Sequence, residues 1–137
     1  YLGNLNAKRD WGHARDYIKA MHLMLQAEHP DDFVIATGKP YSVRKFAQMA
    51  FAEIDIQLTF SGDGDLEIAY VAVNDGIYPV KVGQTVIKID PRYYRPAEVD
   101  MLVGNAEKAR AVLNWKPEHT IEQIISEMVQ SDIKEMK

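Results

Sequence analysis

The spacing of the apolar residues changes near Gln57, and this change limits the folds open to the chain. Before Gln57, residues 14–25 and 43–54 carry apolar side chains at the three- and four-residue intervals of a helix with one buried face. After it, short apolar runs alternate with turn signals rich in glycine, asparagine and aspartate, as in hairpins. A chain with both periods is predicted to be a small mixed α/β domain.

Short strands are predicted where a compact apolar run lies between turn residues. The strands expected from the sequence are residues 1–6, 32–37, 58–60, 66–73 and 85–89. The aspartate- and glycine-rich stretch after Phe60 lacks both the lysine-serine tail of a phosphate loop and the closing glutamate of a calcium loop. It is therefore interpreted as a hairpin turn.

About four helices are predicted, and capping residues mark the start of three of them. Ser42 precedes the helix over 43–54, Asn105 precedes a short helix that ends at Leu113, and Thr120 with Gln123 forms a capping box. The first helix is expected to bury a stripe made of Ala14, Tyr17, Ile18, Met21, Met24 and Leu25. The carboxylates expected to be solvated are those of Asp16, Glu28 and Glu53.

The composition favours a single domain over residues 1–137, because 47% apolar content is enough for one core. A formal net charge of −4 argues against a nucleic-acid or anionic-membrane surface. The chain has no cysteine, and its four histidines lack metal-binding spacing, so no metal site is predicted. No apolar run is long enough to cross a bilayer, and a cytoplasmic protein is expected.

Two arginine-bearing stretches are candidates for binding an anion. Arg9 directly precedes the first helix, where backbone N–H groups and a guanidinium can point the same way. The alternative is a surface ion pair between Arg9 and Asp10 or Asp16. Residues 90–100 hold two arginines, two tyrosines and two prolines, which suits a rigid binding loop. The alternative for that loop is simple packing by its tyrosines.

The usual parts of an active site are missing from these residues. The sequence has no GxGxxG, no G-x-S-x-G and no cysteine nucleophile, so no cofactor-binding or catalytic residue is predicted. Tyr41 and Lys45 have the spacing of a catalytic pair, but Tyr41 precedes the cap Ser42 and lies outside the helix, so the spacing is read as chance. The chain is interpreted as holding a ligand rather than transforming one.

Several motifs carry a resemblance to a known family. Arg-Asp-Trp-Gly-His-Ala at 9–14 and Asp-Pro-Arg-Tyr-Tyr-Arg-Pro-Ala-Glu-Val at 90–99 resemble the C-terminal part of GDP-mannose 4,6-dehydratases. These enzymes belong to the extended short-chain dehydrogenase/reductases, and the resemblance runs from end to end, most loosely over 62–84. Residues 32–38, 41–44 and the Leu-Asn-Trp-Lys-Pro at 113–117 agree with it. The chain also opens on Tyr1, as though a longer protein preceded it.

The resemblance implies a C-terminal substrate domain without the N-terminal Rossmann domain that binds NADP and carries the catalytic residues. The whole enzyme would convert GDP-mannose to GDP-4-keto-6-deoxymannose and water and form a homo-oligomer, whereas this chain alone would be inactive and bind no cofactor. An apolar face normally covered by a partner is expected to be exposed. The substrate-binding residues implied are Arg9 and Arg95 on the diphosphate, Glu98 near the ribose, and Gly3 and Asn4 beside the base.

Lys8 and Arg92 would make secondary contributions to that binding. Two other readings stay open. The chain is either the same portion of a related GDP-sugar reductase or epimerase, or a catalytically silent interaction domain.

Overall fold

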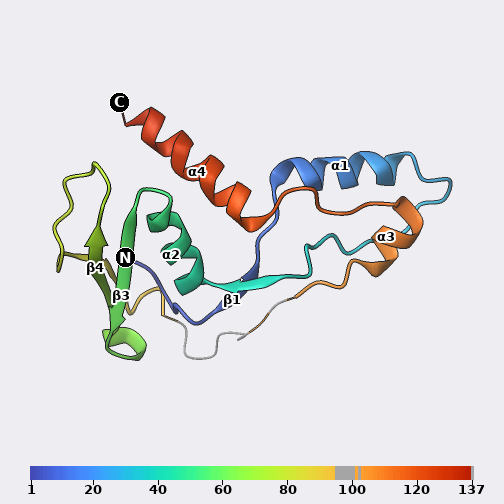
Figure 1. Cartoon of the computed structure of the whole chain (residues 1–137). Coiled ribbons are helices and arrows are strands. Elements are labelled where there is room, and N and C mark those ends of the chain that lie inside the picture. Colours follow the sequence, from blue (N-terminus) through green and yellow to red (C-terminus); the bar gives the residue numbers. More distant parts are fainter. Residues whose placement is uncertain (95–100, 102, 137) are drawn as a thin grey trace.

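The computed structural model describes residues 1–94, 101 and 103–136, which form an elongated α/β structure (Figure 1). Four α-helices lie in the described residues: α1 (Ala14–Leu25), α2 (Val43–Ala52), α3 (Glu107–Leu113) and α4 (Ile121–Glu135). The strands are β1 (Lys8–Asp10), β2 (Pro40–Ser42), β3 (Ile56–Ser61), β4 (Ile68–Asn74) and β5 (Thr85–Lys88). The predicted fold class is confirmed.

One buried cluster lies where α2 packs against the antiparallel sheet of order β3-β4-β5. We call it the sheet cluster, and its buried members are Leu5, Ala47, Ala69, Ile87 and Ile89. Ala69 and Val71 of β4 have no exposed surface, as expected of alternate residues on one face of a strand. The three strands predicted after Gln57 are confirmed with shifted ends, because Leu66 belongs to a short 3-10 turn (Gly64–Leu66) and Ile89 follows β5.

The strands predicted over 1–6 and 32–37 are wrong. Within 1–6 only Leu2 forms a bridge, to Ile89, and the Asn4 side chain accepts the Asn6 N–H at 2.9 Å, which makes a turn instead of a ladder. No strand of the described residues pairs with 32–37. The second sheet instead joins β1 to β2, with Arg9 opposite Tyr41.

A second buried cluster lies between α1, α3 and the segment after α3. We call it the helix cluster, and its buried members are Ala20, Ala106, Ala109, Leu113 and Trp115. Trp115 is 1% exposed, and its indole N–H donates to the backbone oxygen of Asp16 at 2.9 Å. Trp115 therefore links the start of α1 to the end of α3.

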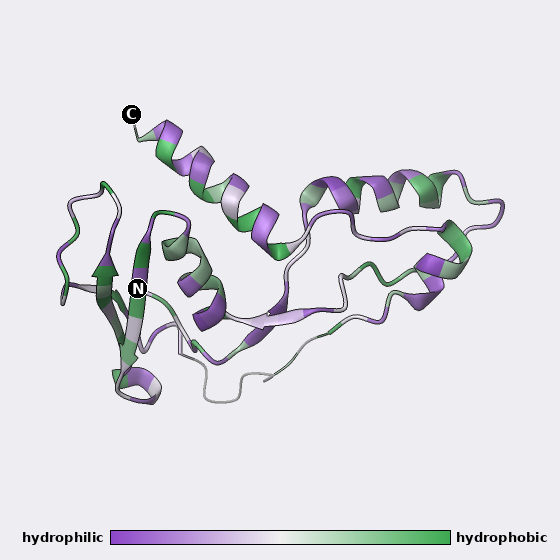
Figure 2. Ribbon diagram, viewed as in Figure 1, coloured by the Kyte–Doolittle hydropathy of each residue, from purple (hydrophilic) through white to green (hydrophobic). Residues whose placement is uncertain are grey.

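The face of α1 that packs inward differs from the predicted one. Tyr17 and Met24 contact the helix cluster, but Ile18, Met21 and Leu25 are 65%, 61% and 82% exposed. Figure 2 shows apolar and polar residues mixed along the whole length of this helix. The spacing correctly indicated a helix, but α1 has apolar residues on more than one side, and only one of those sides is covered in this structure.

Asp16 is buried at 2% exposure, which corrects the expectation that it is solvated. Its carboxylate accepts hydrogen bonds from the backbone N–H groups of Glu118 and His119, each at 3.1 Å. It also forms a hydrogen bond with Nδ1 of His119 at 2.8 Å. Burial raises the pKa of Asp16, but these hydrogen bonds outweigh it, so that the pKa is lowered from its ordinary value. A charged residue inside the fold thus joins α1 to the segment before α4.

The helix starts follow the predicted capping chemistry. Ser42 Oγ accepts the Lys45 N–H, and Thr120 and Gln123 form the expected capping box. Asn105 accepts the Glu107 N–H, although the N-cap position itself falls on Ala106. No helix in the described part of the chain has the length and apolar character needed to cross a membrane.

Candidate functional site

A surface cleft of about 470 Å³ lies where the N-terminal segment, β1, the start of α2 and the loop after β5 meet. We call it the Arg9 cleft. Its lining residues are Leu2, Gly3, Asn4, Ala7, Arg9, Val43, Arg92 and Tyr93. The structure therefore brings together Gly3, Asn4 and Arg9, three of the five residues predicted to bind a ligand.

Strand pairing places Arg9 at this cleft. Arg9 is the middle residue of β1, and its Nη1 donates to the backbone oxygen of Lys8 at 2.8 Å. Its half-buried side chain also borders a second cleft of about 450 Å³, beside Tyr17 and Gly104. Arg9 thus lies between two hollows of the surface.

The two acidic partners considered for Arg9 both accept hydrogen bonds from other residues. Asp10 accepts the N–H groups of Thr37 and Gly38 at 3.1 and 2.7 Å, and these bonds tie the end of β1 to the turn before β2. Asp16 is held by the segment before α4. Their carboxylates therefore have structural roles of their own.

Gly3 allows two loops to touch at the cleft. A Cβ on Gly3 would lie 2.5 Å from the carbonyl oxygen of Tyr93, which is too close for any larger residue without movement. The Leu2 N–H donates to Lys88 at 3.0 Å, and the Asp90 N–H donates back to Leu2 at 2.9 Å. Gly3 and Asn4 consequently form one wall of the cleft, beside the loop that follows β5.

Arg92 lines the cleft but is paired with an acid. Its Nε and Nη2 donate to the two carboxylate oxygens of Asp90 at 3.1 and 2.7 Å. These bonds lower the pKa of Asp90 to about 2 and raise the pKa of Arg92. An anion in the cleft would compete with Asp90 for this guanidinium, which agrees with the secondary part expected of Arg92.

Arg95 and Glu98, the other two predicted site residues, lie outside the described residues. That Arg95 binds the same diphosphate as Arg9, and that Glu98 lies near the ribose, stay predictions. Tyr93, Val43, Ala7 and Leu2 line the cleft and were not singled out as site residues. Tyr93 belongs to the loop that was predicted to be functional, but no sequence signal marked Val43, at the start of α2, as a site residue.

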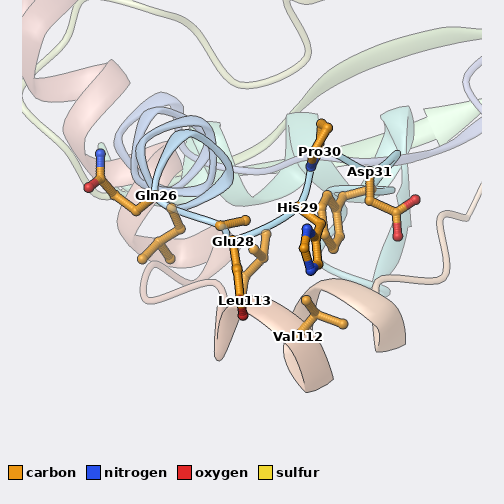
Figure 3. A pocket seen from close by; sticks show the side chains of 10 residues that line it. Gln26, Glu28, His29, Pro30, Asp31, Val112 and Leu113 are labelled. Carbon is orange, nitrogen blue, oxygen red and sulfur yellow. The ribbon is translucent and has the colours of Figure 1, made fainter.

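A roomier cavity of about 550 Å³ lies away from all the predicted site residues (Figure 3). Figure 3 shows its wall of Glu28, His29, Pro30 and Asp31 facing Val112 and Leu113 of α3. Asp31 pairs with Lys108 at 2.7 Å, and the Lys108 ammonium lies 5.2 Å from the centre of the Phe33 ring. The Arg9 cleft holds three of the predicted site residues and this cavity holds none of them, so we place the candidate site at the Arg9 cleft.

The residues of the Arg9 cleft can bind an anionic group, and the cleft wall beside them can accommodate a planar ring. One guanidinium group can donate hydrogen bonds to two phosphate oxygens at once, and two arginines, Arg9 and Arg92, line this cleft. Gly3 and Asn4 add a wall of backbone and amide groups that can lie against a planar ring. The geometry suits a phosphorylated ligand such as a nucleotide.

Solved structures share this fold. RMD of Pseudomonas aeruginosa, complexed with NADPH, matches 99% of this chain with a TM-score of 0.67 and 17% identity, over 36% of its own length. The dTDP-glucose 4,6-dehydratase of Bacillus anthracis, in complex with NAD, matches 97% of this chain with a TM-score of 0.64 and 19% identity, over 33% of its own length. The chain therefore has the fold of a part of these two proteins.

Sequence similarity shows to which family the chain belongs. A family profile described as GDP-mannose 4,6 dehydratase matches residues 1–128, and the chain belongs to that family. It is 50% identical to a GDP-mannose 4,6 dehydratase of Dictyostelium discoideum, over all of this chain and 36% of the relative. It is 51% identical to GDP-mannose 4,6 dehydratase 2 of Caenorhabditis elegans, over 99% of this chain and 33% of the relative. The chain spans about a third of the length of these relatives.

Proposed function

We propose that this chain is the C-terminal, substrate-binding portion of a GDP-mannose 4,6-dehydratase and that the Arg9 cleft holds the GDP part of the substrate. The observation that carries the proposal is the meeting of Gly3, Asn4 and Arg9 in one cleft, in a chain that belongs to this family. Arg9, with Arg95 from the loop after β5, would neutralise the diphosphate. Arg92 would contribute less, because Asp90 already pairs with it.

The residues of this chain do not fit a dinucleotide cofactor. They include no GxGxxG between a strand and a helix, and a backbone loop of that kind is what holds a pyrophosphate in dinucleotide-binding folds. NADP and the residues that oxidise, dehydrate and reduce the sugar would therefore belong to a Rossmann domain outside these residues. The part played by this chain is to bind and orient GDP-mannose.

We place the contact with that Rossmann domain at α1 and the segment after it. Ile18, Met21 and Leu25 of α1 are largely exposed, as is Val34 at 53%. Val34 belongs to a segment whose sequence favours a strand but which has no partner strand in the described residues. Exposed apolar residues on a helix, and a strand-like segment without a partner strand among the described residues, are both features of a surface that another domain covers. A homo-oligomer and a cytoplasmic location are proposed for the whole enzyme as well.

Calorimetric titration with GDP tests the proposal. We expect binding to weaken about tenfold or more in Arg9→Ala or Arg95→Ala, because each variant removes a charge-assisted contact to phosphate. Arg15→Ala is the matched control: it removes the same charge from a side chain that is 71% exposed and pairs with Glu127 on α4. Guanosine without phosphates should bind more weakly than GDP.

Absence of heat at millimolar GDP would count against GDP binding and favour a silent interaction domain. Equal losses of affinity in Arg9→Ala and Arg15→Ala would show a general charge effect instead of a site. A related GDP-sugar reductase or epimerase would also bind GDP, so that this alternative is separated only by assaying GDP-mannose turnover in the whole enzyme.

A further inference from the structure

A partly buried ion pair is connected by hydrogen bonds to the wall of the Arg9 cleft. Glu67, which follows the 3-10 turn, is 6% exposed, and its carboxylate faces the guanidinium of Arg44 on α2. Nη1 of Arg44 donates to one carboxylate oxygen of Glu67, and Nη2 donates to the other at 3.0 Å. This two-point contact fixes the plane of the guanidinium as well as its position.

The same guanidinium holds the N-terminal segment. Nη2 of Arg44 also donates to the side-chain oxygen of Asn6 at 2.8 Å. The backbone N–H of Asn6 donates in turn to the side-chain oxygen of Asn4 at 2.9 Å, and Asn4 lines the cleft. A continuous chain of hydrogen bonds therefore runs from the buried carboxylate of Glu67 to the cleft wall.

Backbone contacts place Arg44 beside this segment. The Arg44 N–H donates to Leu5 at 2.9 Å, and the Val43 N–H donates to Ala7 at 3.1 Å. The guanidinium also lies 4.8 Å from the centre of the Phe60 ring on β3. Lysine at this position could not form the fork, because an ammonium is a point charge that cannot align with both carboxylate oxygens and also reach Asn6.

We propose that Arg44 is a positioning residue for the candidate site: held by Glu67, it fixes Asn6 and, through Asn6, the Asn4 turn that forms one wall of the Arg9 cleft. The part that concerns GDP rests on the proposed function. Arg44 does not line the cleft and acts through Asn6.

Asn6→Ala is the decisive variant, because it removes the hydrogen bond from Arg44 to Asn6 and leaves the pair of Arg44 and Glu67 in place. Asn6 is exposed, so the midpoint of thermal unfolding should stay close to that of the wild type. We expect GDP binding to weaken about three- to tenfold, the worth of one hydrogen bond. Arg44→Lys should have a similar effect, and the two changes together should weaken binding by less than the product of the single effects.

Lys45→Met is the matched control for Arg44→Met. Both remove one positive charge from α2, but Lys45 lies away from the cleft and beside Gln48 and Met49. Arg44→Met should weaken GDP binding and Lys45→Met should not. Equal effects would overturn the positioning role and leave only a general effect of charge.

Backbone amide exchange, followed by nuclear magnetic resonance without ligand, tests the positioning independently of GDP. Asn6→Ala and Arg44→Lys should speed exchange at the Ala7 N–H, which donates to Asn4 at 3.4 Å, and leave the Val71 N–H of β4 unchanged. Unchanged exchange at Ala7 would overturn the inference. Altered exchange in a protein that binds no GDP would support the positioning and overturn the proposed function. GDP binding unaffected by Asn6→Ala would overturn the positioning alone.

Discussion

The sheet cluster and the helix cluster are both buried, but by different kinds of contact. In the sheet cluster, hairpins bring β3, β4 and β5 together, and α2 covers them, so each strand pairs with one that lies at most ten residues away in the chain. In the helix cluster, α1 rests on α3 and on Trp115, which come from nearly a hundred residues further along. Only one side of α1 is covered by this arrangement.

The difference shows what an apolar pattern does and does not specify. A helix that is apolar on more than one side needs more than one neighbour. The described residues cover only one side of α1, and Ile18, Met21 and Leu25 are exposed. This supports the proposal that the helix cluster, and not the sheet cluster, contacts the remaining part of the enzyme. Four substitutions test the comparison.

Trp115→Ala should have the largest effect. It removes a buried indole that also donates to Asp16, and we expect the free energy of unfolding to fall by about 3–5 kcal/mol. Urea unfolding followed by circular dichroism measures it, and Trp115→Phe, which keeps a ring, should lose less. A loss below about 1 kcal/mol would mean that the helix cluster is not a true core.

Leu5→Ala makes the corresponding change in the sheet cluster. Leu5 is 1% exposed, and we expect a loss of about 2–4 kcal/mol in the same measurement. Leu66→Ala is the control, because Leu66 is 79% exposed and should change the free energy of unfolding by less than about 0.5 kcal/mol. If Leu5→Ala leaves the α1 signals native while the sheet unfolds, the two clusters do not unfold as one unit.

Asp16→Asn should lower the free energy of unfolding by about 1–3 kcal/mol at neutral pH, because it removes a hydrogen-bonded charge from the helix cluster. The native pKa of Asp16 lies below its ordinary value of 3.8, so the unfolded chain takes up a proton more readily than the folded one. The stabilisation is complete above that ordinary value and is lost as the pH falls through the native pKa. The difference between wild type and variant should therefore shrink below about pH 4. A difference that is constant from pH 7 to pH 3 would show that the charge does not matter.

Ile18→Ser should have the smallest effect, within about 0.5 kcal/mol of the wild type, because Ile18 is exposed on α1 in this chain. Ala20→Leu, on the buried side of the same helix, should cost about 1–3 kcal/mol by overfilling the helix cluster. In the whole enzyme, the proposal predicts that Ile18→Ser becomes costly. A large loss in the isolated chain would mean that the outward side of α1 is already packed.

Local chemistry made most of the elements predictable. Ser42, Thr120 and Gln123 cap their helices as expected, because a cap depends on residues within one turn. The alternation in 68–74 and the turn at Asn74 likewise depend on near neighbours. Arg9 was named from its place before the first helix, and Gly3 and Asn4 through a family resemblance. That these residues line one cleft with Val43 depends on how the N-terminal segment lies against the start of α2.

Four predictions failed. The strand over 1–6 failed because of the local turn between Asn4 and Asn6, and in the other three cases a distant partner decided the outcome. Residues 32–37 favour a strand but have no neighbouring strand among the described residues. Asp16 was expected in solvent, but the backbone of residues 118 and 119 closes over it. The buried side of α1 differs from the predicted stripe: Ala20 packs in the helix cluster with Tyr17 and Met24 against it, whereas Ile18, Met21 and Leu25 are exposed.

The amino-acid sequence by itself determined the helices, the hairpins and the family, since periodicity, capping and motifs depend on residues close together in the chain. The tertiary structure alone decided which side of α1 is buried, where Asp16 lies and how Arg44 reaches Asn6. These outcomes depend on contacts between residues tens of positions apart, and the spacing of apolar side chains carries no information about which distant segment will supply the opposite surface.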